Sequence, residues 1–269
     1  MPNLFSVKDK VAIITGGIGH LGTQYTKVLL ENKAKVAVFD ININGKNDYL
    51  STQRKNPHLK LYKTDITKKN GIRQSLDKTK KDLGKPSILI NNAALDAPPG
   101  YSSNENISFE EYSAKSWDRV FAVNLKGMFL TSQVVGGFMA RNGGGSIINI
   151  SSVYGNVSPD QRIYAYRAKK GKPFFKPVSY AVTKAGVINF SRYLATYWAD
   201  RKVRVNTLSL GGVFNHQDKE FVKEYARRVP MARMAKDDEY SGAILFLASD
   251  ASSYMTGSNI IIDGGLTAW

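Results

Sequence analysis

A glycine-rich turn between two short apolar runs is the feature that most constrains the fold. Residues 10–15 are rich in β-branched side chains, and 16–22 read Gly-Gly-Ile-Gly-His-Leu-Gly. A helical pattern of apolar residues follows, and a second apolar run, 35–40, ends in Asp40. Strand, glycine turn, helix, strand and acid form a dinucleotide-binding unit in this order. The glycines let the backbone approach a pyrophosphate, and the first N–H groups of the helix can bind it.

The acid at the end of the second strand indicates which dinucleotide is bound. Asp40 lies 18 residues after Gly22, where it can accept hydrogen bonds from the adenosine ribose hydroxyls. Its carboxylate would repel a 2′-phosphate, so we expect NAD(H) in preference to NADP(H). The residues of this unit that we expect to contact the cofactor are Gly16, Gly17, Gly19, His20, Leu21, Gly22, Asp40 and Ile41.

Strands and helices alternate along the rest of the chain. Further strands are expected at 59–63, 87–91, 146–150, 203–208 and 259–263, with helices at 67–83, at 116–141, from Tyr180 onward and around Ile244. About seven strands alternating with helices predict a parallel sheet covered on both faces. A chain of 269 residues with 42% hydrophobic content can bury one such core. We therefore expect a single Rossmann-type, doubly wound α/β domain over 1–269.

Composition excludes several kinds of site. The chain has no cysteine, which excludes disulfides and thiolate metal ligands, and its three histidines are far apart, so we expect no metal. No signal peptide pattern and no apolar run long enough for a bilayer are present, and we expect a cytoplasmic protein. The formal net charge of +16 is spread along the chain. We therefore favour an anionic small substrate over nucleic acid or membrane as the partner.

Two tyrosine–lysine pairs have the spacing of a catalytic dyad. Tyr180 and Lys184 lie four residues apart at the start of a helical pattern, and so share one face. A neighbouring ammonium lowers the pKa of a phenol, which can then act as a general acid or base. Tyr166 and Lys170 have the same spacing, but a glycine and a proline follow within three residues and prevent a long helix. We therefore expect Tyr180 to be the reactive tyrosine.

This order of motifs resembles the short-chain dehydrogenase/reductase family over nearly the whole chain. The resemblance rests on the glycine turn, on Asn91-Asn92-Ala93 after the fourth strand, and on four further positions: Asn124, Ser152, Tyr180 and Lys184. It implies that Tyr180 exchanges a proton with the substrate oxygen and that Ser152 hydrogen-bonds this oxygen. It also implies that Lys184 holds the nicotinamide ribose and lowers the pKa of Tyr180, and that Asn124 anchors a water.

The same resemblance implies more of the cofactor site and a homotetramer or dimer. The additional cofactor-binding positions are Asp65, Ile66, Asn92, Ala93, Ala94, Tyr180, Lys184, Gly211 and Val213. Three positions depart from the family pattern: His20 replaces the middle glycine, where we expect it to point to solvent, Ala94 replaces a glycine, and Leu210 replaces a proline. Ser152 and Tyr180 are 28 residues apart, about twice the usual spacing, which predicts an insertion at 158–178 beside the substrate mouth.

The stretches 153–178 and 211–236 carry many basic, aromatic and amide side chains. Ligands of open α/β sheets lie beyond the carboxyl ends of the strands, so these stretches should meet the substrate, the second as a lid. The substrate-binding residues that we expect are Ser152, Tyr154, Arg162, Gly212 and Asn215. Arginine and lysine recognise phosphate and carboxylate, so a phosphorylated or nucleotide-linked sugar is the expected substrate.

Four segments, 158–162, 193–198, 211–215 and 263–269, are similar to oxidoreductases of the flagellin modification protein A type. That resemblance implies a role in sialic-acid-like sugar biosynthesis for bacterial surface glycans, including flagellin glycosylation. Alternatives remain open: a 3-oxoacyl-[acyl-carrier-protein] reductase, a polyol or gluconate dehydrogenase, or a non-catalytic NAD sensor.

Overall fold

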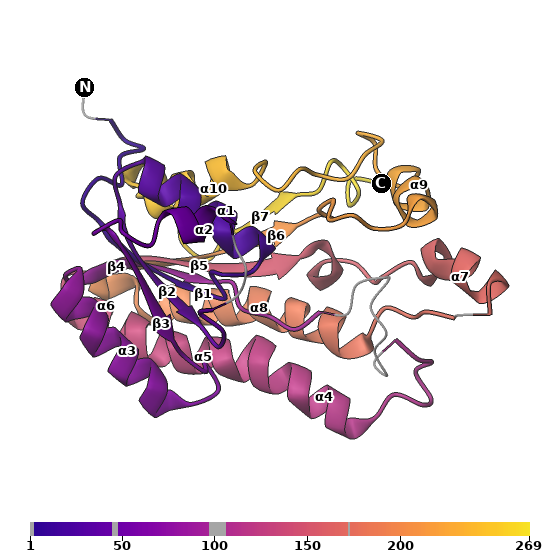
Figure 1. The fold of residues 1–269 in the computed structure, drawn as a ribbon, viewed down its shortest axis with the longest axis horizontal. Helices are drawn as coiled ribbons and strands as arrows, with labels where there is room; N and C mark the ends of the chain where they lie inside the picture. The colour runs from indigo at the N-terminus through magenta and orange to yellow at the C-terminus, as the bar shows by residue number, and fades with distance from the viewer. Residues whose placement is uncertain (1–2, 45–47, 97–105, 172) are drawn as a thin grey trace.

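One seven-stranded parallel sheet organises the molecule (Figure 1). The computed structural model describes residues 3–44, 48–96, 106–171 and 173–269. The strands are β1 (Val11–Thr15), β2 (Lys35–Asp40), β3 (Leu59–Lys63), β4 (Pro86–Asn91), β5 (Gly145–Ser152), β6 (Val203–Leu210) and β7 (Asn259–Ile262). Their order is β3-β2-β1-β4-β5-β6-β7, and each neighbouring pair is parallel. The predicted Rossmann-type, doubly wound fold is confirmed.

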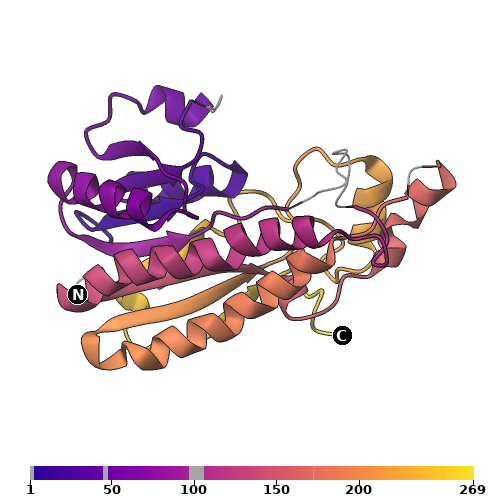
Figure 2. The same ribbon diagram turned by 90° about the horizontal axis from the view of Figure 1, so that it is seen from below.

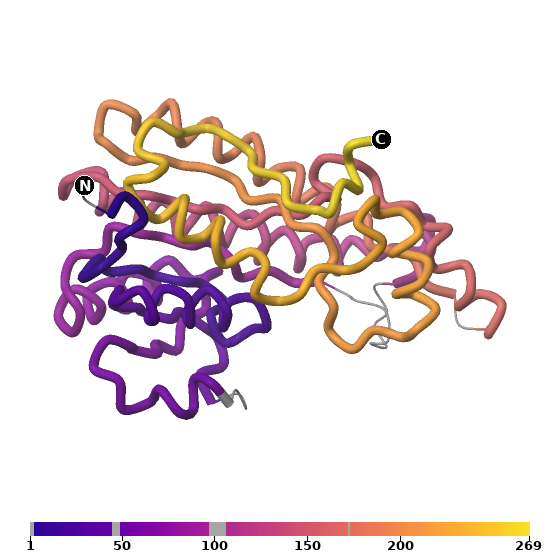
Figure 3. The backbone as a smooth tube through the Cα atoms, turned by 90° about the horizontal axis from the view of Figure 1, so that it is seen from above, coloured from indigo at the N-terminus to yellow at the C-terminus, as the bar shows by residue number. Residues whose placement is uncertain are grey.

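Helices cover both faces of this sheet, as the apolar patterns predict. One face carries α1 (His20–Glu31), α2 (Asp48–Thr52) and α10 (Ser241–Ala248), with α1 packed against α10 (Figure 3). The other face carries α3 (Lys69–Asp82), a long helix over 114–141 and α8 (Val178–Tyr197), and the last two lie side by side (Figure 2). Each helical layer buries its own apolar cluster against the sheet. This packing fixes the positions of the strands.

The long helix over 114–141 is not a uniform α-helix. It consists of α4 (Ala114–Phe121), the π-helical η1 (Ala122–Gly127), α5 (Met128–Thr131), the π-helical η2 (Ser132–Gly136) and α6 (Gly137–Arg141). Asn124 lies in the first π segment. π segments inside α-helices frequently mark functional sites, and here one carries a residue that the sequence singled out.

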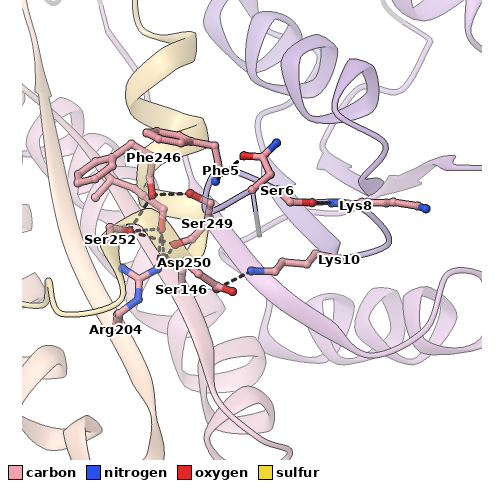
Figure 4. Close-up of polar contacts among 12 residues, drawn as sticks. Phe5, Ser6, Lys8, Lys10, Ser146, Arg204, Phe246, Ser249, Asp250 and Ser252 are labelled. Atoms are coloured by element: carbon pink, nitrogen blue, oxygen red, sulfur yellow. Dashed lines mark hydrogen bonds and ion pairs between the residues drawn. The ribbon is translucent and has the colours of Figure 1, made fainter. Parts of the chain in front are cut away.

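The amino end of the sheet is closed by polar contacts (Figure 4). The guanidinium of Arg204 donates to the carbonyls of Leu247 and Ser249 at the end of α10, and the Ser146 hydroxyl also donates to the carbonyl of Leu247. Lys10, just before β1, forms an ion pair with Asp250 at 2.8 Å. These contacts join the starts of β1, β5 and β6 to the end of α10 and the residues after it. The long connections 153–178 and 211–236 lie at the opposite, carboxyl end of the sheet.

Short helices at the carboxyl end were missed by the sequence analysis, which read 153–178 and 211–236 as plain connections. They are η3 (Val153–Gly155), η4 (Gln161–Tyr164), α7 (Ala165–Lys169) and α9 (Lys219–Ala226); η5 (Ala199–Arg201) and η6 (Asp250–Ser252) lie elsewhere. Ile163, Tyr164 and Phe174 of the first stretch pack against Phe221 and Tyr225 of α9. The two stretches therefore stabilise each other beyond the ends of β5 and β6 (Figure 1). Part of the polar loop that the sequence predicts at 95–113, residues 97–105, and Lys172 of the predicted insertion lie outside the described residues.

Candidate active site

The glycine turn after β1 is built so tightly that side chains do not fit. Gly16 has φ of 64°, and a Cβ there would lie 2.8 Å from the Cα of Ala93. A Cβ on Gly22 would lie 2.2 Å from the carbonyl oxygen of Gly16. The turn therefore brings the start of α1, at His20, against the segment that follows β4. This arrangement presents the first N–H groups of α1 to one side of a groove, as anion binding requires.

The groove beside this turn is a cavity of about 610 Å³. Asp40 lies on its wall at the end of β2, and its carboxylate accepts hydrogen bonds from the N–H groups of Ile18 and Asn42, at 3.1 and 3.0 Å. The predicted cofactor-binding residues that line the cavity are Gly16, Gly19, His20, Leu21, Gly22, Asp40, Ile41, Asp65, Ile66, Asn92, Ala93 and Ala94. The glycine turn, the helix start and the carboxylate on one wall fit a dinucleotide.

The segment after β4 is fixed to the glycine turn by hydrogen bonds. The side-chain amide of Asn92 donates to the carbonyls of Thr15 and Gly16 at 3.1 and 3.0 Å, and the N–H of Ala93 bonds the Thr15 hydroxyl. Asp65, at the end of β3, accepts hydrogen bonds from Thr67 in its own turn. These contacts span β1 and β4, so the Asn-Asn-Ala motif holds the floor of the groove in a defined position.

Tyr180, Ser152 and Lys184 converge where β5 ends against α8. Ser152 is the last residue of β5, and it lines the same cavity as Tyr180. Lys184 is 4% exposed, lies 5.6 Å from the centre of the Tyr180 ring and donates from Nζ to the carbonyl of Ile150 at 3.0 Å. Tyr180 lies in the first turn of α8 and Lys184 one turn later, so the helix presents both to the same cavity.

The pKa values of this pair differ from the expectation. We expected Lys184 to lower the pKa of Tyr180, but enclosure by protein, followed by the nearby carboxylate of Asp96, holds it above its ordinary value. Burial also lowers the pKa of Lys184 to about 8. The cost of removing phenolate and ammonium from water outweighs their mutual attraction in this protein.

Asn124 acts as a brace between three elements. Its Oδ1 accepts from the N–H of Leu95 at 2.7 Å, and its Nδ2 donates to the carbonyl of Leu95 at 3.0 Å and to the hydroxyl of Thr183 at 3.2 Å. The π segment η1, the end of β4 and α8 are thus joined through one side chain. The water-anchoring role implied by the resemblance stays a prediction, and the structure adds a positioning role.

A second cavity, of about 650 Å³, adjoins the groove at the Tyr180 wall. The residues that line both cavities are His20, Leu21, Asn92, Ala94 and Asp96. Of the predicted substrate-binding residues, Ser152, Tyr154, Gly212 and Asn215 line the second cavity, as do Lys184, Gly211 and Val213. His20 is exposed, as we expected for the start of a helix, and it also borders both spaces.

Arg162 does not reach this cavity, contrary to our expectation. Its side chain is 85% exposed and binds Asp160, which caps η4. Five other cations of the two stretches also form ion pairs: Arg167 with Asp218, Lys170 with Glu220, Arg227 with Glu224, Arg228 with Asp160 and Glu224, and Arg233 with Glu239. Ion pairing therefore compensates part of the positive charge of these stretches.

Sequence reasoning missed several residues that line the second cavity. They are Asp96, Tyr164, Gln217, Phe221, Tyr225 and Met234. Lys176, which the sequence showed only as one cation among many, lines it too. A signal existed for Asp96, because it follows the Asn-Asn-Ala motif within three residues; the others depend on how the two stretches fold together. Within the described ranges, no cluster of three metal-ligating side chains is present, and no helix is long and apolar enough to cross a membrane.

Comparisons with known proteins agree with this geometry. A family model described as enoyl-(acyl carrier protein) reductase matches residues 17–267. An NAD-dependent glycerol dehydrogenase of Listeria innocua is 31% identical over 268 residues, covering 98% of this chain and 96% of the relative. A short-chain dehydrogenase of Leptospira borgpetersenii, solved with bound NAD⁺, has a TM-score of 0.86 and 32% identity, covering 99% of this chain and 96% of its own. A gluconate 5-dehydrogenase of Burkholderia cenocepacia, solved with NADP and tartrate, has a TM-score of 0.84 and 26% identity, covering 99% and 98%.

Proposed function

The chain belongs to the short-chain dehydrogenase/reductase family of NAD(P)-dependent oxidoreductases, and from this premise we propose that it uses NAD to interconvert a secondary alcohol and a ketone in a small polyhydroxylated substrate. The observation that carries this proposal is that Ser152, Tyr180 and Lys184 together line a cavity that adjoins the cofactor groove. A reacting carbon in that cavity has proton-transfer groups on one side and the groove on the other.

In the proposed mechanism, the bound nicotinamide supplies the hydride acceptor or donor. The Ser152 hydroxyl would hydrogen-bond the reacting oxygen. In the oxidation, the Tyr180 phenolate would take the proton of the alcohol; in the reduction, the Tyr180 phenol would donate its proton to the carbonyl oxygen. Lys184 is protonated below a pKa of about 8 and stabilises negative charge on Tyr180 from across its ring. Asn124 keeps α8 and the end of β4 in register, which holds Tyr180 beside the groove.

We propose NAD rather than NADP because of Asp40. Its carboxylate ends β2 on the groove wall, where a 2′-phosphate would meet a negative charge. Replacing Asp40 with alanine should therefore raise kcat/KM for NADP⁺ and lower it for NAD⁺. An unchanged ratio of the two values would contradict this assignment.

The cavity favours hydroxyl groups as the recognised feature of the substrate. Hydrogen-bonding side chains on its wall include Ser152, Tyr154, Asn215 and Gln217, and Lys176, a cation on the same wall, is paired with Asp96. The relatives named above act, by their names, on glycerol and gluconate, which are polyhydroxylated. A polyol or its ketose is accordingly our first candidate.

A phosphorylated or nucleotide-linked sugar of a surface-glycan pathway is the second candidate, as the resemblance to flagellin modification proteins implies. Lys176 favours it, because this cation lines the cavity itself.

We also propose assembly into a homotetramer or dimer. The large side chains Phe129, Val182, Tyr193 and Tyr197 are exposed on α5 and α8, and Trp269 is 80% exposed, so it does not cover its own core. Light scattering after gel filtration would test the assembly.

The test of the proposed function is the change in NADH absorbance with a substrate panel. The panel contains glycerol, four- to six-carbon polyols and ketoses, sugar phosphates, nucleotide sugars and a 3-oxoacyl thioester. We expect NAD-dependent turnover of polyols or ketoses that is abolished in Tyr180→Phe. Turnover confined to the phosphorylated sugars would select the second candidate, and turnover confined to the thioester would identify an acyl reductase. NAD binding without turnover of any compound would support a sensor.

A further inference from the structure

A second lysine reaches the Tyr180 ring, and it comes from outside the motifs described above. Lys176 is buried, with its side chain 6% exposed, and its Nζ lies 4.5 Å from the centre of the Tyr180 ring. The same Nζ donates to Oδ1 of Asp96 at 2.5 Å. Both partners line the second cavity together with Ser152. An ion pair therefore lies beside the proton-transfer group, on the wall that a substrate would meet.

The folded insertion holds Lys176 in place. The side-chain amide of Gln161 bonds the backbone of Lys176 in both directions: its Oε1 accepts from the N–H at 2.9 Å, and its Nε2 donates to the carbonyl at 3.1 Å. Two residues before Lys176, the Phe174 ring packs on Tyr164 with 4.5 Å between ring centres, and Tyr164 stacks on Phe221 of α9. The insertion therefore holds Lys176 in a preorganised position, because its residues 161–164 contact residues 174–176 and also pack on α9.

Both groups of the pair can hydrogen-bond more than one partner. An ammonium has three donors, of which Lys176 uses one for Asp96, and a carboxylate has about four acceptor positions. A hydroxyl is both a donor and an acceptor, and it can donate to a carboxylate while accepting from an ammonium. An anionic group would gain from Lys176 but would be repelled by Asp96. The chemistry of the pair therefore matches a neutral hydroxyl better than a phosphate.

We propose that the Lys176–Asp96 ion pair binds the hydroxyl on the carbon next to the reacting carbon, so that the recognised unit is a vicinal diol or its α-hydroxyketone. This proposal rests on the proposed function, because it assumes that the reacting oxygen lies at Ser152 and Tyr180. Lys176 lies against the Tyr180 ring, and both members of the pair line the cavity together with Ser152, so the pair shares the wall at which the reacting oxygen would bind. A site built to hydrogen-bond a hydroxyl discriminates strongly against analogues that lack it.

The test compares two four-carbon ketones in NADH-dependent reduction. Erythrulose carries a hydroxyl on each carbon beside its carbonyl, and butanone carries none. The variants are Lys176→Met and Asp96→Asn. Lys170→Met is the matched control, because Lys170 also forms an ion pair, with Glu220 at 2.8 Å, and lies 5.6 Å from the ring centre of a tyrosine, Tyr166, but does not line the cavity. Thermal unfolding and NADH affinity identify any variant that fails to fold.

We expect the wild type to favour erythrulose, and Lys176→Met to lower kcat/KM for erythrulose by about 10- to 100-fold, mainly through KM, as expected for a lost hydrogen bond to a charged group. Turnover of butanone should change by less than about 2-fold, and the Lys170→Met control should change neither substrate. Asp96→Asn should have the same selective effect.

An equal loss for both ketones in the variants would overturn the proposal, because it would show a general structural or catalytic role. A wild type that reduces both ketones equally well would also overturn it while leaving the proposed function intact. If the wild type reduces neither ketone, the polyol function itself falls, and the proposal falls with it.

Discussion

Two helices, α7 and α8, each present a tyrosine with a lysine four residues later, in very different surroundings. At α7, which has only five residues, the Tyr166 hydroxyl donates to Asp218 at 2.7 Å, and Lys170, the residue after the helix, is exposed and paired with Glu220. On α8, which has 20 residues, Tyr180 lines a cavity together with Ser152, and Lys184 is buried. The same spacing therefore gives a set of surface contacts at α7, which we call the clasp (Tyr166 and Lys170 with Asp218 and Glu220), and a candidate catalytic dyad on α8.

The difference shows that spacing alone does not make a proton-transfer site. Tyr166 and Lys170 each bond an acid of the opposite stretch, Asp218 and Glu220, so this pair joins the stretch 153–178 to α9. The α8 pair instead meets a hydroxyl at the end of a strand and the edge of the cofactor groove. A long helix packed on the sheet can position a dyad against a bound cofactor, whereas a short surface helix stabilises a loop.

Removal of each phenol should give the largest contrast. Tyr180→Phe should lower kcat by about 10³-fold, the size expected for loss of a general acid or base. Tyr166→Phe removes only the hydrogen bond to Asp218 and should retain activity within about 2-fold. Steady-state NADH assays on both purified variants check this. Inactivity of Tyr166→Phe together with an active Tyr180→Phe would reverse the assignment.

Removal of each ammonium should give a smaller contrast. Lys184→Met should lower kcat/KM by about 100-fold, because Tyr180 loses the cation across its ring and the cofactor loses a polar contact. Lys170→Met should leave kcat/KM unchanged within about 2-fold. The same assay, with NAD⁺ affinity measured in parallel, separates these effects. A fully active Lys184→Met would remove this lysine from the mechanism.

Lys184→Met should also stabilise the fold at neutral pH. Burial lowers the pKa of Lys184 to about 8 from its ordinary 10.5, so at pH 7 the folded protein holds an ammonium that is costly to bury. Methionine removes that cost, which amounts to about 3 kcal/mol of unfolding free energy for a shift from 10.5 to about 8. Between pH 8 and 10.5 the unfolded chain binds the proton and the folded protein releases it, so wild-type stability rises with pH and the advantage of methionine shrinks.

Urea unfolding at pH 7 and pH 10 measures this effect, and Lys170→Met serves as the exposed control. A Lys184→Met variant that is less stable than the wild type at both pH values would show that the ammonium contributes more through its contacts than it costs through burial.

The smallest expected effect concerns the clasp itself. Asp218 caps α9 by accepting from the N–H of Phe221 at 2.9 Å and also binds Tyr166. Asp218→Ala should therefore lower the unfolding free energy by about 1 to 2 kcal/mol. Asp200→Ala, which removes an acid whose side chain is 80% exposed, should have no comparable effect. Equal stabilities of the two variants would mean that the α7 pair is not a clasp.

Local pattern was enough to predict much of this molecule. The strands and the glycine turn follow from short-range features. The glycine and the proline after Lys170 favour Tyr180 over Tyr166 as the reactive tyrosine, and this choice stays a prediction. Alternating strands and helices predict a parallel sheet of about seven strands, whereas the order of the strands in the sheet comes from the structure.

What the sequence could not show depends on contacts between distant segments. Lys176 and Asp96 are 80 residues apart and meet only after folding. Arg228 and Asp160 are 68 residues apart, and their contact is one reason why a basic stretch is compensated rather than open to an anion. The raised pKa of Tyr180 results from burial, which no spacing rule reports.

The most direct test of the central claim follows hydride to the product. NADH that is fully deuterated at the reactive carbon of its nicotinamide would be mixed with erythrulose, and the tetritol product would be weighed by mass spectrometry. We predict a product heavier by one mass unit from the wild type and from Tyr166→Phe, and no such product from Tyr180→Phe. Deuterium transfer by Tyr180→Phe at the wild-type rate, or its loss in Tyr166→Phe alone, would contradict the assignment of this site to α8.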